Sequence, residues 1–435
     1  MALICHFAYA QQIDSTFNNQ YIQKLIHDEV QKELLKEKEL QKAQPRKLFG
    51  DRIRFSGSAL LRAAEWDLHQ NGINPSSGIT RKDHNRFWSR FNFFLAVDSD
   101  LSETVSVNAR IRTGNNQYSF VTFGENLDER LRIILDEFWI QWKPNNYVLR
   151  AGRQTASRIW SNQQGSQFDV PKHDGVTLMK EYDLNPVKLT PKVGYFVEYY
   201  RNNSSFKDQG RVFGGALAAS LSQTNTVWTA ETGFIKAEQL PNRYLNDIAE
   251  TSNGIGVKYH DGDLAPTYAI WTNQIGVVFK NFHNLSFKFD YYHNLANYKQ
   301  NPISNMIYDK NGFNSFSNPD DYNNATAPNF TKQKQGFVAS VSIGNLAKPK
   351  NFWFEASYLY MEKYAAMDYF AQYDYSRWAS TNIKGPEFGA GYRFNNYLMF
   401  RAKYFITQEI KGLDGIDPSY RRSANRLRLD FVMNF

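Results

Sequence analysis

The chain has a single cysteine, scattered histidines and no long apolar segment, and each of these absences excludes a class of protein. Cys5 stands alone near the N-terminus, so no intrachain disulfide can stabilise the 435 residues. The mean hydropathy is −0.57, and no apolar run reaches about 18 residues, which excludes membrane-spanning helices. The eight histidines form neither an HExxH motif nor a cluster with cysteine, so no metal site is expected.

Catalysis also finds little support in the sequence. The glycines of Ser56-Gly57-Ser58 and Gly389-Ala390-Gly391 lie in strand-like segments, unlike those of a nucleophile elbow or a phosphate-binding loop. We therefore expect no enzymatic activity and no cofactor. No nucleic-acid partner is expected either.

Aromatic residues are abundant instead. The chain has 33 Phe, 26 Tyr and 9 Trp, which together make up 16% of its residues. A transmembrane β-barrel carries aromatic girdles at both membrane interfaces around a polar interior, so it can be aromatic-rich and polar on average. A soluble chain of this length would divide into domains, yet no linker is visible after residue 50. The composition therefore favours one large barrel.

Residues 425–435 alternate between apolar and polar side chains. The apolar positions are Leu427, Leu429, Phe431, Met433 and Phe435, and the polar positions include Arg426, Arg428, Asp430 and Asn434. A period of two gives a strand one apolar and one wet face, which a barrel strand needs between lipid and a water-filled lumen. Phe435 also resembles the C-terminal signal that outer-membrane proteins present to the barrel-insertion machinery, and it is our candidate assembly signal.

The N-terminal residues differ from the rest. Residues 1–10 are predicted to be a signal peptide, because they are apolar and end in the small-x-small pattern Ala8-Tyr9-Ala10. They lack a basic region, which leaves a truncated start or a chance apolar N-terminus as alternatives. Residues 21–42 are predicted to form an amphipathic periplasmic helix, since apolar residues recur at three- and four-residue steps. This helix is either a solvated lead-in or a self-associating element.

Residues 51–435 follow a period of two, which predicts an all-β fold: a transmembrane antiparallel barrel of about 16 strands. The expected strands are 52–64, 86–98, 101–112, 131–143, 145–154, 174–182, 187–201, 210–223, 225–238, 267–280, 284–298, 334–346, 350–362, 384–395, 396–410 and 424–435. Short connections, such as Asp98-Ser99-Asp100, alternate with long polar ones. This alternation places Ile255–Tyr259 in an outer loop, 239–266, instead of in an additional strand.

The alternation also predicts which charged side chains face the lumen. The inward basic residues are Arg54, Arg62, Arg86, Arg90, Arg110, Arg112, Arg150, Arg393, Arg401, Lys403, Arg426 and Arg428. The inward acids are Glu137, Glu198, Asp290, Glu355, Glu387 and Asp430. A basic lining favours anions, because low-dielectric walls focus the field on whatever enters. The alternative is that these arginines pair with the acids and brace a wide barrel.

The long connection 155–173 is the candidate constriction. A barrel of this width leaves an open channel unless a loop folds inward to narrow it. The candidate constriction residues are Arg158, Trp160, Phe168 and Asp169. A surface-exposed loop is the alternative.

One block of the sequence resembles a known family. It comprises Leu149-Arg150-Ala151-Gly152-Arg153-Gln154, Trp160, Phe168-Asp169 and His173-Asp174-Gly175-Val176-Thr177-Leu178. This block is similar to the GRQ strand, loop and DGV strand of bacterial general porins, especially the alginate-export porins and the putative porins of Bacteroidetes. The charged helix that leads into Ile53–Arg62 looks most like the last group. The resemblance implies a 16-stranded channel but does not identify alginate as its cargo.

These observations predict an outer-membrane porin of a Gram-negative bacterium, with its N-terminal helix in the periplasm. Small hydrophilic solutes would diffuse passively through it, with a mild preference for anions. The alternatives are a polysaccharide or oligosaccharide exporter, a plugged barrel that serves as an adhesin or anchor, and a soluble β-rich protein. The expected partners are outer-membrane lipids, lipopolysaccharide and the barrel-insertion machinery, and a homotrimer is compatible with this fold.

Overall fold

The computed structural model describes residues 52–70, 84–114, 121–123, 133–169, 172–199, 209–240, 256–258, 266–299, 307–309, 330–367, 370–371, 380–411 and 422–435. The chain divides into two units, Met1–Arg54 and Phe55–Phe435, and the second holds the fold described below. The expected signal peptide, 1–10, and the expected helix, 21–42, lie outside the described residues. Within the described ranges, no helix is long and apolar enough to cross a membrane.

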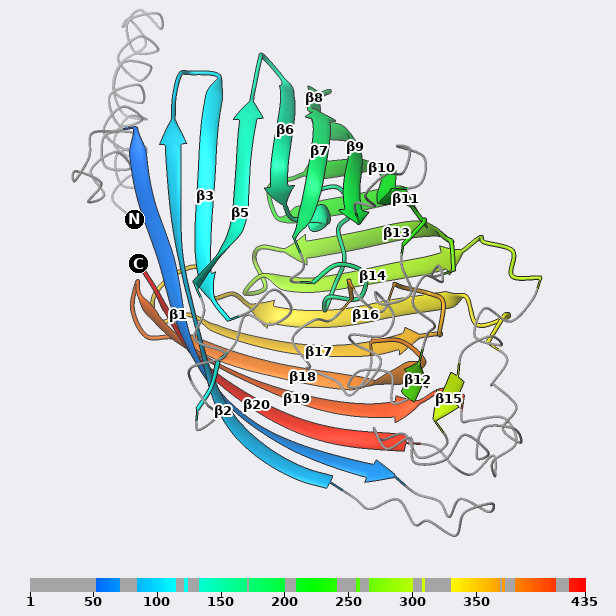
Figure 1. Cartoon of the computed structure of the whole chain (residues 1–435). Helices are drawn as coiled ribbons and strands as arrows, with labels where there is room; N and C mark the ends of the chain where they lie inside the picture. The colour runs from blue at the N-terminus through cyan, green and yellow to red at the C-terminus, as the bar shows by residue number, and fades with distance from the viewer. Residues whose placement is uncertain are drawn as a thin grey trace, which may run out of the picture. The chain divides into compact units, whose positions relative to one another are not determined.

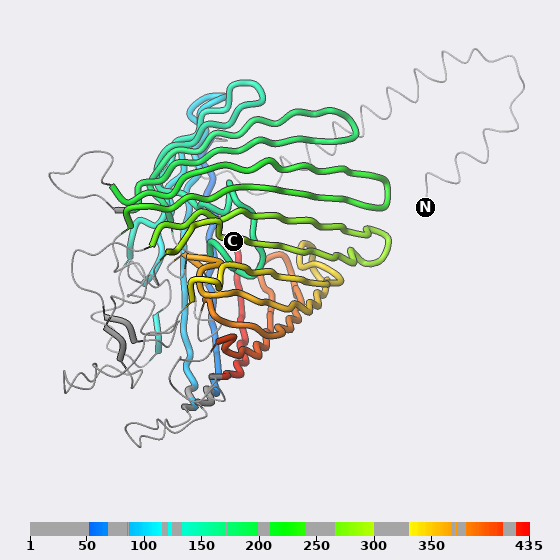
Figure 2. The backbone as a smooth tube through the Cα atoms, turned by 90° about the vertical axis from the view of Figure 1, so that its right-hand side faces the viewer, coloured from blue at the N-terminus to red at the C-terminus, as the bar shows by residue number. Residues whose placement is uncertain are grey.

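The second unit is a closed antiparallel β-barrel, which confirms the predicted fold class (Figure 1). Its sixteen long strands, counted over the described residues, are β1 (Ile53–Gln70), β2 (His84–Asp100), β3 (Val105–Thr113), β5 (Ile133–Trp142), β6 (Tyr147–Gln154), β7 (His173–Lys180), β9 (Val187–Tyr199), β10 (Gly210–Ser222), β11 (Thr226–Glu238), β13 (Tyr268–Phe279), β14 (Leu285–Asn294), β16 (Gln335–Gly344), β17 (Phe352–Met361), β18 (Ile383–Arg393), β19 (Leu398–Glu409) and β20 (Arg422–Asn434). Each long strand pairs with the next one along the chain. Figure 2 shows the resulting succession of neighbouring strands.

Most strands lie close to their predicted positions, with two differences near the N-terminus. β1 continues past residue 64 to Gln70, and β2 runs through the expected turn to Asp100. The turn instead lies at Leu101–Thr104, where the Leu101 N–H donates to the Val105 carbonyl oxygen at 2.9 Å. The Ser102 hydroxyl oxygen also accepts a hydrogen bond from the Val105 N–H at 3.0 Å and so stabilises the turn at this place. The predicted turn at Asp98-Ser99-Asp100 was therefore wrong by a few residues.

Short strands lie beside the barrel strands or apart from them. β4 (Val121–Thr122) pairs with β2, and β8 (Tyr182–Asp183) pairs with β9. β12 (Gly256–Lys258) pairs only with β15 (Ile307–Asp309), in a separate two-stranded sheet. The described residues of the segment 255–259, Gly256–Lys258, therefore add no strand to the barrel, as the alternation of short and long connections predicted.

The two faces of the barrel wall have opposite character. On β20, Leu427, Phe431 and Met433 are exposed on the outside, whereas Arg428 and Asp430 are buried on the inside. The exposed apolar side chains form a surface suited to lipid. The inward polar side chains require partners in the lumen, because a buried charge without one is costly.

The barrel closes between the first and the last strand. β1 pairs with β20 along its length, and the pairing sets Arg62 opposite Asp430. At the end of this seam, Gly57 and Phe435 exchange backbone hydrogen bonds of 2.8 and 3.1 Å. The Phe435 ring covers Gly57, where a Cβ atom would lie 2.4 Å from the ring. Glycine at position 57 therefore makes room for the terminal aromatic side chain.

A β-bulge interrupts the alternation on β5. The register between β3 and β5 shifts where Arg110 pairs with Glu137 and Ile111 pairs with Leu135, so Asp136 is an extra residue. Such an extra residue lets two consecutive side chains face the same side of a sheet. Asp136 and Glu137 both contact basic residues of the lumen through this bulge.

Replacing Gly152 by alanine is expected to destabilise the barrel. Gly152 has a φ of +123°, and a Cβ atom would lie 2.2 Å from the Phe138 carbonyl oxygen. An L-residue in such a conformation costs about 1–3 kcal/mol. Urea unfolding of the refolded barrel, followed by its heat-modifiable gel mobility, measures the loss. Ala151→Ser, at the neighbouring exposed position, is the control, and an equal loss in both variants would contradict this explanation.

Candidate functional site

Residues 155–169, here called the lumen loop, connect β6 to β7 and lie against the inside of the barrel (Figure 1). The loop begins with a 3₁₀ helix, η2 (Ala156–Arg158). Not one of its fifteen residues is exposed, and Ile159 and Trp160 are completely buried. An outward surface loop would leave much of this segment in contact with water. The lumen loop therefore fills part of the barrel interior.

Trp160 fixes the lumen loop to the barrel wall. Its Nε1–H donates to the carbonyl oxygens of Gly215 and Phe234, at 3.2 and 3.0 Å. Its ring stacks on Phe168 with centroids 5.5 Å apart and also contacts Phe196 at 6.2 Å. The indole thus buries a large apolar surface and satisfies its one donor, as buried tryptophans usually require.

Two acids on the far wall hold the backbone of the lumen loop. Glu231 on β11 accepts hydrogen bonds from the Ser161 N–H at 2.7 Å and the Ser161 hydroxyl at 3.0 Å. Asp290 on β14 accepts from the Gln163 N–H at 2.8 Å and from Gln163 Nε2 at 2.7 Å. Charged acceptors make stronger hydrogen bonds than neutral ones. These carboxylates are therefore occupied by the loop and are mostly withdrawn from water.

Farther along, the lumen loop reaches the wall formed by β17 and β19. Gln164 Nε2 donates to Glu355 Oε1 at 2.5 Å, and Lys403 Nζ donates to Gln164 Oε1 at 2.9 Å. Lys403 also lies 3.8 Å from Glu355. The loop consequently spans from β6 across β11 and β14 to β19.

A second segment after β17, described at residues 362–367 and 370–371, meets the lumen loop from the opposite wall. The Asp169 N–H donates to the Phe370 carbonyl oxygen at 3.0 Å, and the rings of Phe168 and Phe370 lie 5.9 Å apart. Gln167 Nε2 donates to the Ala365 carbonyl oxygen at 2.8 Å. The side chains of Phe168, Phe370, Gln167 and Ala365 are buried, so the two segments share one core inside the barrel.

His173 fixes the other end of the loop. Its ring is fully buried, with its centroid 4.9 Å from that of Phe370 and 5.4 Å from that of Phe168. Its Nδ1 atom lies 2.6 Å from Glu198 Oε1. The histidine therefore joins both inward segments to the wall strands β7 and β9.

The predicted lumen arginines divide into several groups, of which the first lies on the closing seam. Arg62 donates from Nε and Nη2 to the two carboxylate oxygens of Asp430, at 2.7 and 3.0 Å. Arg428 Nε and Arg401 Nη2 lie 3.3 and 3.5 Å from the same carboxylate. Arg62 and Asp430 are almost completely buried. Here the arginines brace the barrel.

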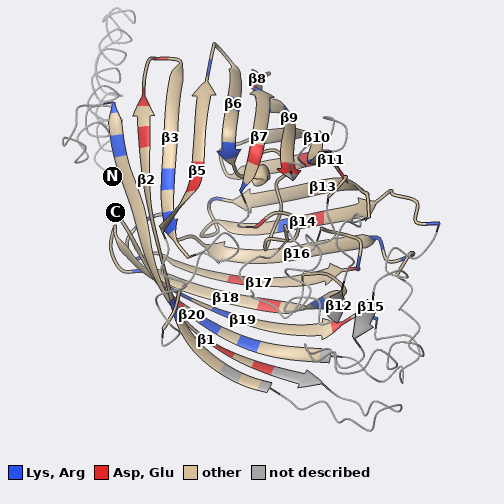
Figure 3. Ribbon diagram, in the orientation of Figure 1, with Lys and Arg blue, Asp and Glu red and all other residues tan. Residues whose placement is uncertain are grey.

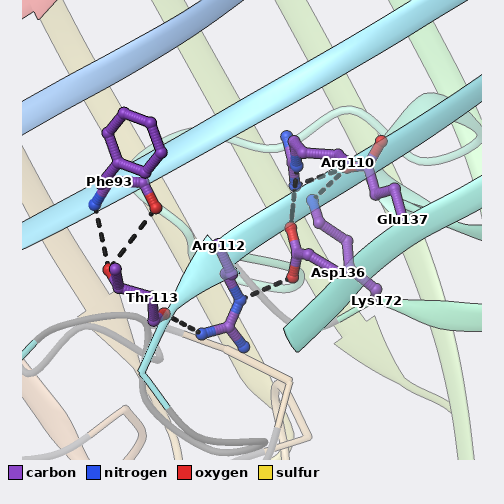
Figure 4. A network of polar contacts seen from close by, with 7 residues as sticks. All are labelled: Phe93, Arg110, Arg112, Thr113, Asp136, Glu137 and Lys172. Atoms are coloured by element: carbon purple, nitrogen blue, oxygen red, sulfur yellow. Dashed lines mark hydrogen bonds and ion pairs between the residues drawn. The ribbon is translucent and has the colours of Figure 1, made fainter. Parts of the chain in front are cut away.

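The second group surrounds the bulge on β5 (Figure 4). Arg110 contacts Asp136 and lies 2.6 Å from Glu137 Oε1, while Arg112 Nε donates to Asp136 Oδ1 at 2.6 Å. Lys172, just before β7, lies 2.9 Å from Glu137 Oε1. Figure 3 shows these basic and acidic segments beside each other on β3 and β5. This group is close to charge balance.

Trp88 lies between two further arginines. The Arg90 and Arg426 guanidinium carbons lie 5.1 and 4.6 Å from its ring centroid. Arg90 Nε also donates to Thr122 Oγ1 at 3.1 Å. Cation–π contacts of this kind hold a guanidinium in place without neutralising it.

The remaining predicted basic residues have different surroundings. Arg393 donates to the carbonyl oxygens of Leu346 and Asn395, both at 3.0 Å, and so braces two short turns. The side chain of Arg86 lies outside the described residues, and Arg54 belongs to the first unit. Arg150, on β6, contacts Gln141 together with Arg158 of the lumen loop. Burial lowers the pKa of Arg158 below its ordinary value.

The alternation of polar and apolar residues along the strands did not identify two acids that contact the site, Asp136 and Glu231. Asp136 falls on the outward parity of β5, and only the bulge turns it inward. The sequence holds a signal for this, because the exposed apolar positions change from odd to even between Leu135 and Phe138. Glu231 lies in the middle of β11, and nothing in the neighbouring sequence marks it as the partner of Ser161. In the part of the chain that the structure describes, no three His, Cys, Asp or Glu residues gather as a metal site.

Comparison with known proteins shows what the chain is similar to. Residues 242–431 match the model of the family described as "Putative porin". The solved structure of OprB from Pseudomonas putida is 11% identical, with a TM-score of 0.52 over 91% of this chain and 97% of that chain. The outer membrane channel DcaP of Acinetobacter baumannii is 12% identical, with a TM-score of 0.44 over 89% of this chain and 98% of that one.

A third similar structure is OmpT, an outer membrane protein of Vibrio cholerae in its trimer form. It is 10% identical and has a TM-score of 0.45 over 88% of this chain and 100% of that chain. No curated protein sequence matches the chain. The likeness to OprB supports the barrel fold, and the family match extends over β13 to β20. The resemblance predicted from the sequence is thereby confirmed over residues 242–431, which match the putative-porin family, and the fold is a β-barrel like that of OprB.

Proposed function

We propose that this porin is a water-filled channel for the passive diffusion of small hydrophilic solutes across the outer membrane, with a mild preference for anions. The family and the fold indicate a channel in place of an enzyme. The lumen loop supports a selective passage, because it narrows a barrel that would otherwise be wide.

The contrast in exposure between lumen cations and lumen acids carries the proposed anion preference. The side chains of Arg401, Arg110 and Lys403 are 32%, 22% and 19% exposed. Asp430 and Asp136, by comparison, are 1% and 4% exposed. At Arg401 and Arg110, permeating ions thus meet guanidinium groups while the paired carboxylates lie behind them. At Lys403, the paired Glu355 is 17% exposed and is as accessible as the ammonium group. Fixed charge on the wall of a narrow pore sets the local ratio of anions to cations.

Replacing Arg401 and Lys403 by glutamine should move the zero-current potential in a salt gradient toward cation preference. Both side chains lie on the inward face of β19, and their positive charges partly contact water. The shift should be large at low salt and small at 1 M salt, where the Debye length is about 3 Å. A planar-bilayer measurement at both salt concentrations provides the test.

The matched control is Arg153→Gln. Arg153 lies on the outer face of β6, where it pairs with Asp174 at 2.7 Å. This variant removes a positive charge without changing the lumen. An unchanged zero-current potential in the β19 double variant would mean that these cations are structural, and the proposed anion preference would be wrong.

A barrel closed by its own loops is the second candidate function, and one observation favours it. Trp160, Phe168 and Phe370 are all at most 3% exposed, so part of the lumen is dry and packed. A fully plugged barrel would serve as an adhesin or an anchor. Such a barrel shows no stepwise conductance in a planar bilayer, whereas the proposed channel does.

Several partners stay predictions. The exposed apolar belt would contact outer-membrane lipids and lipopolysaccharide, and Phe435 would be recognised by the barrel-insertion machinery. Assembly as a homotrimer is a prediction that native mass spectrometry of the detergent-solubilised protein can test. Export of a polysaccharide has no observation in the described lumen that favours it over diffusion of small solutes.

A further inference from the structure

Arg150 and Arg158 share one neutral hydrogen-bond acceptor. Arg150 Nη2 donates to Gln141 Oε1 at 2.9 Å, and Arg158 Nη2 donates to the same oxygen at 3.3 Å. Arg150 faces inward from β6, opposite Gln141 on β5, and Arg158 ends η2 at the beginning of the lumen loop. Because both guanidinium groups lie within hydrogen-bond distance of the same oxygen, their like charges are close together and repel each other.

The acids near this pair are occupied elsewhere. Glu137 is held by Arg110 and Lys172, at 2.6 and 2.9 Å, and Asp98 accepts a hydrogen bond from Asn108 Nδ2 at 2.9 Å. Within the described part of the chain, no carboxylate lies within 4.0 Å of either the Arg150 or the Arg158 guanidinium. The pair therefore keeps a local excess of positive charge.

The protein also leaves most of the donors of this pair unused. Each guanidinium has five N–H donors, and each donates one hydrogen bond, to Gln141, among the described residues. The buried Nε atoms of both arginines have no partner there. The Arg150 guanidinium also lies 3.4 Å from the centroid of Trp139. Stacking of this kind fixes the plane of the guanidinium and leaves its edge available for an acceptor.

We propose that Arg150 and Arg158 form an oxyanion-binding subsite, which takes one carboxylate, phosphate or sulfate group of a permeating solute. An oxyanion presents several charged oxygens that match the planar fork of a guanidinium. A bound oxyanion would offset the repulsion between the two guanidinium groups, which the neutral amide oxygen of Gln141 does not offset. The proposal rests on the proposed function, because a solute reaches the pair only through an open lumen.

The position of the subsite connects it with permeation. Arg158 belongs to the segment that narrows the lumen, and Arg150 belongs to the wall beside it. Arg62 and Arg112 differ from this pair, because each donates directly to a carboxylate. The subsite is therefore a place where an anion can pause in transit, in contrast to Arg62 and Arg112, whose guanidinium groups are held by carboxylates of the barrel wall.

Binding of inorganic sulfate to the purified, folded full-length protein tests the proposal. Isothermal titration calorimetry in detergent gives the dissociation constant, and a planar bilayer in potassium chloride shows whether added sulfate reduces the current in a saturable way. The double variant Arg150→Gln/Arg158→Gln should bind sulfate at least about tenfold more weakly, since it removes both positive charges and the charge-assisted hydrogen bonds of both guanidinium groups.

A second variant tests the same site without removing an arginine. Gln141→Glu places a carboxylate at the shared acceptor position, so it should also weaken sulfate binding. Arg153→Gln, which removes an outward arginine from the same strand, should bind sulfate as the natural protein does. Heat-modifiable gel mobility establishes that each variant is a folded barrel.

The outcomes separate this subsite from the proposed function. Channels that conduct but bind no sulfate, or a double variant that binds it as the natural protein does, would overturn the subsite and leave the channel intact. A barrel without stepwise conductance would contradict the proposed function. In that case calorimetry tests the subsite separately: sulfate binding that is weakened in the double variant would support it, and no sulfate binding would overturn it.

Discussion

Replacing Glu231 and Asp290 by alanine should raise the single-channel conductance several-fold and increase the fluctuations of the open current. These two carboxylates hold the backbone and side chains of Ser161 and Gln163 through four hydrogen bonds of 2.7–3.0 Å. Without them, the middle of the lumen loop loses its charged acceptors on the far wall. A loop released from the wall moves on a timescale of nanoseconds to microseconds, and the passage that it narrowed becomes wider.

The conductance of the natural barrel and of the double variant should be compared in planar bilayers at high salt, where wall charge contributes little. Asp174→Asn is the control, because Asp174 is an outward acid that pairs with Arg153 and does not contact the loop. Deletion of residues 161–167 should give a similar increase. If both the alanine variant and the deletion keep the natural conductance, the lumen loop does not limit the current.

Asp430→Asn should lower the free energy of unfolding of the barrel by about 3–5 kcal/mol, because the loss of one partner leaves buried charge without its counter-ion. Asp430 is the acceptor for both donors of Arg62 across the seam between β1 and β20. Arg428 and Arg401 also lie within 3.5 Å of its carboxylate. An amide at this position cannot balance three guanidinium groups.

Urea unfolding of the refolded barrel in detergent measures this loss. The double variant Arg62→Leu/Asp430→Leu should recover part of the stability, because two apolar side chains can replace a buried ion pair at a small cost. Arg393→Gln is the control, since Arg393 contacts only carbonyl oxygens among its hydrogen bonds here. Equal unfolding curves for the natural barrel and Asp430→Asn would show that the seam does not depend on this carboxylate.

The fold could be predicted from the sequence because every barrel strand repeats the same physical requirement. One face meets lipid and the other meets water, so the period of two is visible at β20 and β14 without any knowledge of their partners. The prediction failed at Asp98–Asp100 and at Asp136, where a few residues decide the geometry. A bulge adds one residue to a strand, so that the residues beyond it switch from one face of the sheet to the other.

The site could be predicted less completely, since its contacts join distant parts of the chain. The alternation of polar and apolar residues predicts that Arg62, Arg110 and Arg150 face the lumen. It does not predict their hydrogen-bond partners, which are carboxylates for the first two and the Gln141 amide for the third. The lumen loop contacts residues as far along the chain as Glu355 and Lys403. Such pairings depend on how the sheet curls, which local sequence does not encode.

The contact between the lumen loop and the segment after β17 has a consequence for how the current would fluctuate. Phe168 and Phe370 share a dry core, and the Asp169 N–H and the Phe370 carbonyl oxygen join the two backbones. Neither segment can withdraw alone without exposing the aromatic side chains of the other. We therefore expect any opening to be cooperative, with the current stepping between two fixed levels and the time spent in each set by the aromatic and hydrogen-bond contacts between the two segments.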